Sequence, residues 1–157
     1  MTKLLLFFSV LSLVLVTRSS AAPQNFGLNE PYESVTEQYL LIQHQLYSDT
    51  MDGVTPAAMS MEKTVDADAG KSFSPQFPAA AAALAQARDL PAARAAFKSV
   101  SLDLVAAFKN ARISTGMLHL IFCPMADASW IQTDVAKAHN PYFGSARPDC
   151  GDTVGNF

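Results

Sequence analysis

The sequence predicts a mainly α-helical protein: an antiparallel four-helix bundle with an irregular C-terminal tail packed on it. Three observations support this prediction. Apolar residues recur at steps of three and four in four segments between residues 32 and 112. Proline and glycine separate these segments at short intervals, which favours antiparallel neighbours. After Gly116 the helical spacing stops and turn-forming residues become frequent.

Residues 1–21 are expected to be a cleavable secretory signal peptide. Lys3 supplies a positive charge, residues 4–16 form an uncharged apolar run, and the small residues Ser19 and Ala21 precede the expected cleavage site. A membrane-spanning helix needs about 20 apolar residues, and this run is shorter. We therefore expect export across the inner membrane to the periplasm, with no membrane span after cleavage.

The exported part is long enough for one domain with one hydrophobic core. We expect a flexible arm over residues 22–31 and a single helical domain over residues 32–154, whose sulfur-containing tail is residues 117–154. Without the signal peptide the chain has nine basic and fourteen acidic side chains and no cluster of lysine or arginine. Binding to nucleic acid or to an anionic membrane needs a basic surface, so neither is expected.

Each expected helix has an inner face that its apolar spacing identifies. In the first two helices, which a break at Gly53 separates, this face consists of Val35, Tyr39, Ile42 and Leu46, and then of Ala58, Met61 and Val65. Ser74-Pro75 and the alanine run 79–83 mark the third helix. The longest helix, about residues 92–112, has an inner face of Ala93, Phe97, Val100, Leu104, Ala107, Phe108 and Ala111.

The tail contains both cysteines of the chain, and the segment Cys123-Pro124-Met125 is its most informative part. Pro124 favours an extended backbone, in which residues two apart point to the same side. A thiolate and a thioether on one side are soft ligands that suit Cu(I) better than Mg²⁺ or Ca²⁺. Cys150 is the candidate that would complete such a metal site.

Two histidines are weaker candidates for the same metal. His119 has the same strand parity as Cys123, but in a regular strand the two residues would lie about 13 Å apart. His139 precedes the Asn140-Pro141 turn, which would have to fold it back toward the sulfurs.

A disulfide between Cys123 and Cys150 is the competing interpretation, since disulfides are favoured in oxidising compartments. Such a bridge would close a loop of about 28 residues and stabilise the fold by about 3 to 4 kcal/mol in the chain-entropy model. The tail would then be a structural or protein-interaction element, with Trp130, Tyr142 and Phe143 packing it onto the bundle or a partner. No catalytic signature accompanies either cysteine, so an enzyme is not expected.

The tail resembles a bacterial domain family of unknown function. The resemblance lies in four short blocks in fixed order, with a helix motif at Arg94–Ser101 before them, and it covers about residues 35 to 154. The blocks are Cys123-Pro124-Met125-Ala126, Trp130-Ile131-Gln132, Asn140-Pro141-Tyr142-Phe143-Gly144 and Cys150-Gly151. The family occurs alone behind a signal peptide, or fused to periplasmic adaptor subunits of copper/silver-type efflux pumps.

This resemblance implies an exported module associated with heavy-metal efflux, with Cys123, Met125 and Cys150 at the recurrent sulfur positions. Its partner would be a periplasmic efflux adaptor or another copper-handling protein. The aromatic, turn and glycine residues of the motifs would have structural roles: Trp130, Asn140, Pro141, Tyr142, Phe143, Gly144 and Gly151. Arg147 departs from the pattern, because the family usually has a methionine three residues before the second cysteine.

Overall fold

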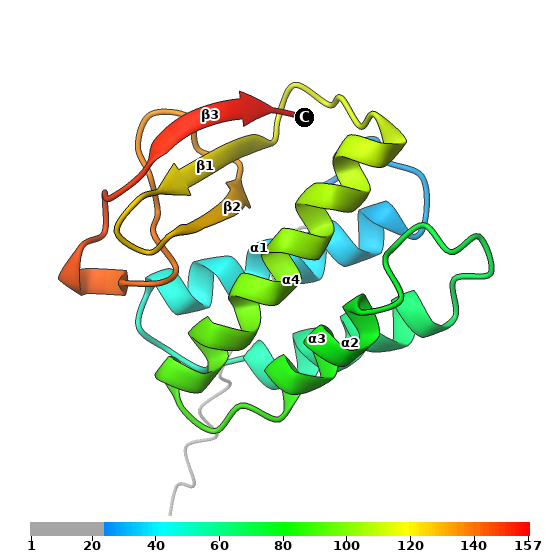
Figure 1. Ribbon diagram of the computed structural model, residues 1–157, viewed down its shortest axis with the longest axis horizontal. Coiled ribbons are helices and arrows are strands. Elements are labelled where there is room, and N and C mark those ends of the chain that lie inside the picture. Colours follow the sequence, from blue (N-terminus) through cyan, green and yellow to red (C-terminus); the bar gives the residue numbers. More distant parts are fainter. Residues whose placement is uncertain (1–23) are drawn as a thin grey trace, which may run out of the picture.

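The computed structural model describes residues 24–157, so the expected signal peptide lies outside the described residues. The described chain forms four α-helices followed by a three-stranded antiparallel sheet (Figure 1). The helices are α1 (Tyr32–Tyr47), α2 (Val54–Asp66), α3 (Phe77–Ala85) and α4 (Leu90–Ala111). The strands are β1 (His119–Cys123), β2 (Ala128–Gln132) and β3 (Asp152–Asn156), with a short 3-10 turn, Gly144–Ala146, between β2 and β3.

The protein is mainly helical, as predicted, but the predicted four-helix bundle with an irregular tail is wrong. The segment taken as irregular contains all three strands of the described chain. β1 is the central strand and is covered on both faces, so its apolar residues do not alternate with polar ones. β3 is short, polar and mostly exposed, and it forms a strand only because β1 pairs with it.

The helical layer follows the predicted apolar spacing closely. Successive helices pack on one another, and α4 also lies against the sheet (Figure 1). The inner faces predicted for α1 and α2 are buried, and so is that of α4 up to Phe108. Ala111 is exposed, contrary to the prediction, because α4 ends there and Arg112 adopts a left-handed conformation.

The segment expected as a flexible arm contacts the start of α1. The backbone N–H groups of Phe26 and Leu28 both donate to the carboxylate of Glu33, at 2.7 and 2.8 Å. Phe26 is buried in the core.

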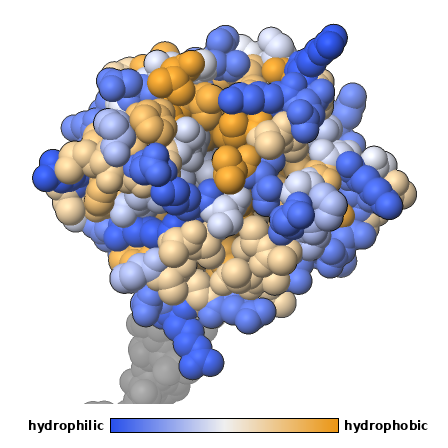
Figure 2. All heavy atoms as spheres, in the orientation of Figure 1, coloured by the Kyte–Doolittle hydropathy of each residue, from blue (hydrophilic) through white to orange (hydrophobic). Residues whose placement is uncertain are grey.

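One face of the sheet lies against α4, and the other faces the loop around Cys150 and Gly151. In the strand order β2-β1-β3, Leu120 and Phe122 point toward α4, and Ile121 and Cys123 toward the loops. A groove of about 470 Å³ lies between α4 and the sheet, and hydrophobic residues gather there on the surface (Figure 2). No helix within residues 24–157 is long and apolar enough to cross a membrane.

Two tyrosine hydroxyls make hydrogen bonds to the backbone of β2, along the edge that no strand of the described chain pairs with. Tyr39 on α1 accepts a hydrogen bond from the backbone N–H of Ile131 at 3.1 Å, and Tyr142 donates to the carbonyl of Ser129 at 2.7 Å. Both hydroxyls also contact Ser101 on α4, at 2.8 and 3.2 Å. Burial raises the pKa of both tyrosines well above the ordinary value, so both hydroxyls remain neutral. The network joins α1, α4, β2 and the tail.

Replacing Tyr39 by Phe is expected to lower the free energy of unfolding by about 1 to 3 kcal/mol, because the buried N–H of Ile131 loses its acceptor. Urea denaturation followed by circular dichroism measures this change. Tyr47→Phe is the matched control, since the ring of Tyr47 stacks on His139 and its hydroxyl has no hydrogen bond within the described chain. Equal midpoints for wild type and Tyr39→Phe would contradict the role assigned to this network.

Candidate functional site

The two cysteines meet at the end of the central strand. Cys123 is the last residue of β1 and is fully buried, and Cys150 is half-buried just before β3. Pairing of Phe122 with Asp152 brings the chain around Cys150 beside Cys123. The two Sγ atoms lie 2.7 Å apart, and the cysteines are not bonded to each other.

The two thiols differ in their acidity. Burial raises the pKa of the Cys123 thiol, but hydrogen bonds to its sulfur outweigh burial and lower the pKa overall. These bonds come from the Cys150 thiol, from the backbone N–H groups of Ala126 and Met125, and from the Asn140 side chain. The pKa of Cys150 is raised, mainly because its thiol donates to Cys123. Cys123 is therefore the more acidic thiol of the pair.

Met125 does not lie on an extended backbone beside Cys123. Residues 124–127 form the turn between β1 and β2, in which the N–H of Asp127 donates to the carbonyl of Pro124 at 3.3 Å. Asp127 itself has a positive φ of 45°. The thioether of Met125 is exposed on this turn, and only its backbone N–H faces the Cys123 sulfur. The expected extended geometry was therefore wrong, and Met125 as a ligand remains a prediction.

The two candidate histidines lie outside the thiol contact. His119 is at the opposite end of β1, four residues from Cys123, which corresponds to about 13 Å of strand. The ring of His139 stacks on Tyr47 at 4.6 Å and lies 3.5 Å from the carboxylate of Asp134. Within residues 24–157, no group of three or more His, Cys, Asp or Glu side chains could hold a metal ion.

Asn140 positions the loop that carries Cys150. This side chain is fully buried and makes hydrogen bonds with both of its polar atoms. Its oxygen accepts from the N–H groups of Tyr142 and Phe143, at 2.8 and 3.1 Å, and its nitrogen donates to the carbonyl of Cys150 at 2.6 Å. Asn140 therefore links the Asn-Pro-Tyr-Phe-Gly turn to the second thiol.

Gly151 lets this loop pass over the sheet. Its φ is 147°, and a Cβ atom there would lie 2.6 Å from the ring of Trp130 and 2.9 Å from the side chain of Ile121. Trp130 is fixed in turn, because its ring N–H donates to the side-chain oxygen of Gln132 at 2.9 Å. The absence of a side chain at residue 151 is thus what allows Cys150 to reach Cys123.

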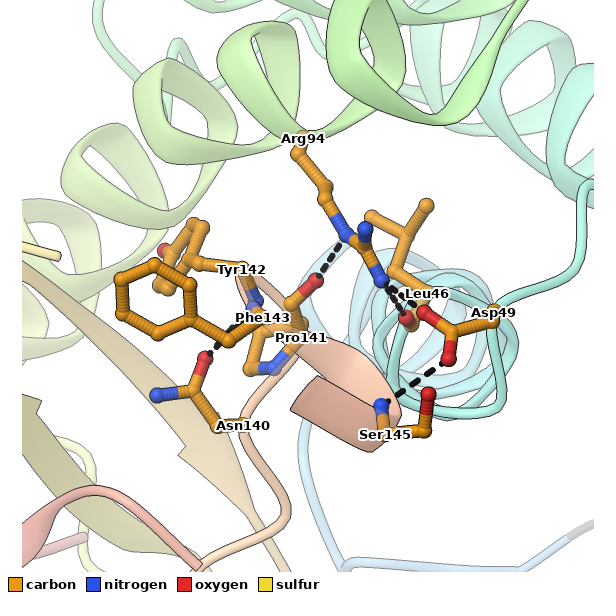
Figure 3. Close-up of polar contacts among 8 residues, drawn as sticks. All are labelled: Leu46, Asp49, Arg94, Asn140, Pro141, Tyr142, Phe143 and Ser145. Carbon is orange, nitrogen blue, oxygen red and sulfur yellow. Dashed lines mark hydrogen bonds and ion pairs between the residues drawn. The ribbon is translucent and has the colours of Figure 1, made fainter. Parts of the chain in front are cut away.

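Arg94 of α4 holds the tail against the helices (Figure 3). Its guanidinium donates to the carbonyls of Pro141 and Leu46, at 2.9 and 2.8 Å, and forms an ion pair with Asp49. The other oxygen of Asp49 accepts from the N–H of Ser145 at 2.9 Å. The motif that contains Arg94 was visible in the sequence, but the partners of Arg94 were not, because they lie about 45 residues away on each side along the chain.

Gly144 lies where the tail comes closest to the Arg94–Asp49 ion pair, and only glycine fits there. Its φ is 51°, and a Cβ atom there would lie 2.0 Å from Asp49 Oδ1 and 2.4 Å from the guanidinium of Arg94. Any other residue at this position would separate the ion pair.

The chain was compared with known proteins, and no protein-family model, curated protein sequence or solved structure matches it. The association with copper efflux that the sequence motifs suggest therefore stays a prediction.

The donor set fits some metals better than others. Structural zinc sites almost always use four protein ligands, and the contact described here supplies two sulfurs. Soft thiolates select Cu(I), which two such ligands can hold. Arg147 is exposed and cannot coordinate a cation. The residues therefore fit Cu(I) held by Cys123 and Cys150.

The Arg94–Asp49 contact predicts a specific loss of stability in acid. Hydrogen bonds from Ser145 and Arg94 lower the pKa of Asp49 to about 2 in the folded protein. An unfolded aspartate titrates near pH 3.9, so the stabilisation is complete above about pH 4 and is lost as the pH falls through 2. The difference in free energy of unfolding between wild type and Asp49→Asn should therefore shrink between pH 6 and pH 2.

Urea denaturation at a series of pH values measures this difference. Asp127→Asn is the control, because Asp127 is 91% exposed and 4.0 Å from Lys98, so its effect should be small at every pH. A difference for Asp49→Asn that stayed constant down to pH 2 would contradict the assignment.

Proposed function

We propose that this protein is an exported module that binds a soft metal ion, Cu(I), through the thiols of Cys123 and Cys150. The observation that carries the proposal is the contact between the two sulfurs, 2.7 Å apart, one buried and one half-buried. No described histidine makes a hydrogen bond to either sulfur, and the proposed role is non-catalytic.

The geometry supports a site that opens on the Cys150 side. Metal–thiolate bonds of about 2.3 Å would place two opposed sulfurs up to about 4.6 Å apart, so the pair must separate to admit an ion. Cys123 ends the central, doubly paired strand and is the fixed ligand. Cys150 lies in an irregular loop and is partly exposed, so its side chain is the one that can rotate.

The acidity of the pair supports the same role. Metal binding requires thiolates, and the lowered pKa of Cys123 makes its thiol the easier of the two to deprotonate. Thiol protons are released when the metal binds. The half-exposed Cys150 also gives a partner a route to the ion. The partner we propose is a periplasmic efflux adaptor or another copper-handling protein, which the motif resemblance suggests.

An anaerobic titration of the reduced exported protein with Cu(I), in competition with a chromogenic chelator, tests the proposal. We expect one tightly bound Cu(I) per chain and at least about a tenfold loss of affinity in Cys123→Ser and in Cys150→Ser. Met125→Leu tests whether the thioether joins the site, with Met59→Leu, an equally exposed methionine on α2, as its control. Unchanged affinity in Cys123→Ser would overturn the proposal.

The same sulfur contact favours a second candidate, a structural or interaction module with a permanent Cys123–Cys150 disulfide. The sulfurs need to approach by only about 0.7 Å to reach a disulfide bond length. Bonding would remove two protons and two electrons from the pair, which an oxidant of the compartment to which the protein is exported would take up. Tyr142 packs on Phe97 of α4, with ring centroids 6.1 Å apart, so the tail is docked on the helices as this role requires.

Mass spectrometry after alkylation without reductant separates the two candidates. Protein recovered from its own compartment should carry two alkyl groups if the pair is a metal site. It should carry none until it is reduced if the pair is a permanent disulfide. The first result would reject the structural candidate.

A further inference from the structure

Two other metal-binding side chains lie together at the opposite end of β1. In Met117-Leu118-His119, Leu118 is fully buried, whereas Met117 and His119 both line the surface. The segment is held against the chain end, because Gly116 N–H donates to the Phe157 carbonyl and Phe157 N–H donates to the Leu118 carbonyl, both at 2.8 Å. The two side chains are thus held by a paired backbone rather than by a loose loop.

Met117 and His119 line the same surface hollow, of about 480 Å³. Its other walls include Phe26, Asn25 and Thr133, and none of its lining residues within the described part of the chain is charged. A hollow without carboxylates gives little attraction to hard ions such as Mg²⁺ or Ca²⁺. A thioether and an imidazole are softer ligands that suit Cu(I).

Both side chains are available to bind. The thioether of Met117 is 44% exposed, although methionine is ordinarily a buried residue. His119 is half-buried, and its ring makes no hydrogen bond or ion pair within the described part of the chain. His139, by contrast, is occupied by Tyr47 and Asp134.

We infer that Met117 and His119 form an accessory site for a soft monovalent ion, Cu(I) or Ag(I). It uses neither cysteine, and about 13 Å of strand separates it from Cys123, so it is distinct from the thiol site. Two neutral ligands hold a cation less tightly than two thiolates do. The accessory site therefore fills after the thiol pair.

The test uses the exported protein with Cys123→Ser and Cys150→Ser, titrated with Ag(I) and followed by NMR. Ag(I) replaces Cu(I) because it is stable in air. We expect the ring protons of His119 and the methyl group of Met117 to shift together. The resonances of His44, exposed on α1, and of Met59, exposed on α2, should stay in place.

Substitution at the site completes the test. His119→Ala or Met117→Leu should weaken the remaining Ag(I) binding at least about tenfold, and His44→Ala or Met59→Leu should leave it unchanged. If the cysteine variant does not fold, the same shifts are sought in wild type at the second equivalent of Ag(I). No shift at His119, or equal shifts at all histidines and methionines, would overturn the inference. Neither outcome touches the thiol site, which the Cu(I) titration of wild type tests separately.

Discussion

The arrangement of the tail depends on the hydrogen bonds and the ion pair that the guanidinium of Arg94 makes. It joins the start of α4 to the last turn of α1 and to the Asn-Pro-Tyr-Phe-Gly turn, through two carbonyls and the carboxylate of Asp49. A planar group with several donors can satisfy these acceptors together, which a lysine could not. Because the turn is fixed in this way, Asn140 is fixed too, and it holds the loop that carries Cys150.

The thiol pair is thus built from one rigid and one adjustable half. Cys123 belongs to a strand paired on both edges, whereas Cys150 follows a loop that only a few hydrogen bonds hold. Because one thiol is fixed and the other can move, the pair is suited to binding and releasing a metal ion and to forming and breaking a disulfide. When reduced, it offers a fixed, more acidic thiol and a movable thiol to a soft ion, and its oxidation to a disulfide needs only a small displacement of the sulfurs. Both proposed roles therefore use the same geometry and differ in redox state.

The helices were predictable, because each has a buried face with regular spacing. The sheet was not, because β1 is apolar on both faces and β3 is polar, and its pairing with β1 rather than its own residues makes it a strand. Both cysteines were candidates from the sequence, and the structure brings their sulfurs together, whereas their role stays a prediction. The place of Met125 was mistaken, because Pro124 begins a turn. The Arg94–Asp49–Ser145 contact joins residues far apart in the chain and leaves no local pattern.

The proposed function requires that both sulfurs bind the metal. X-ray absorption at the copper edge, on protein loaded anaerobically with one equivalent of Cu(I), measures the ligands of the ion. We expect sulfur neighbours near 2.3 Å, two from the thiols or three if Met125 joins them. A first shell of nitrogen or oxygen, or a protein that retains no copper when its thiols are reduced, would contradict the proposed function.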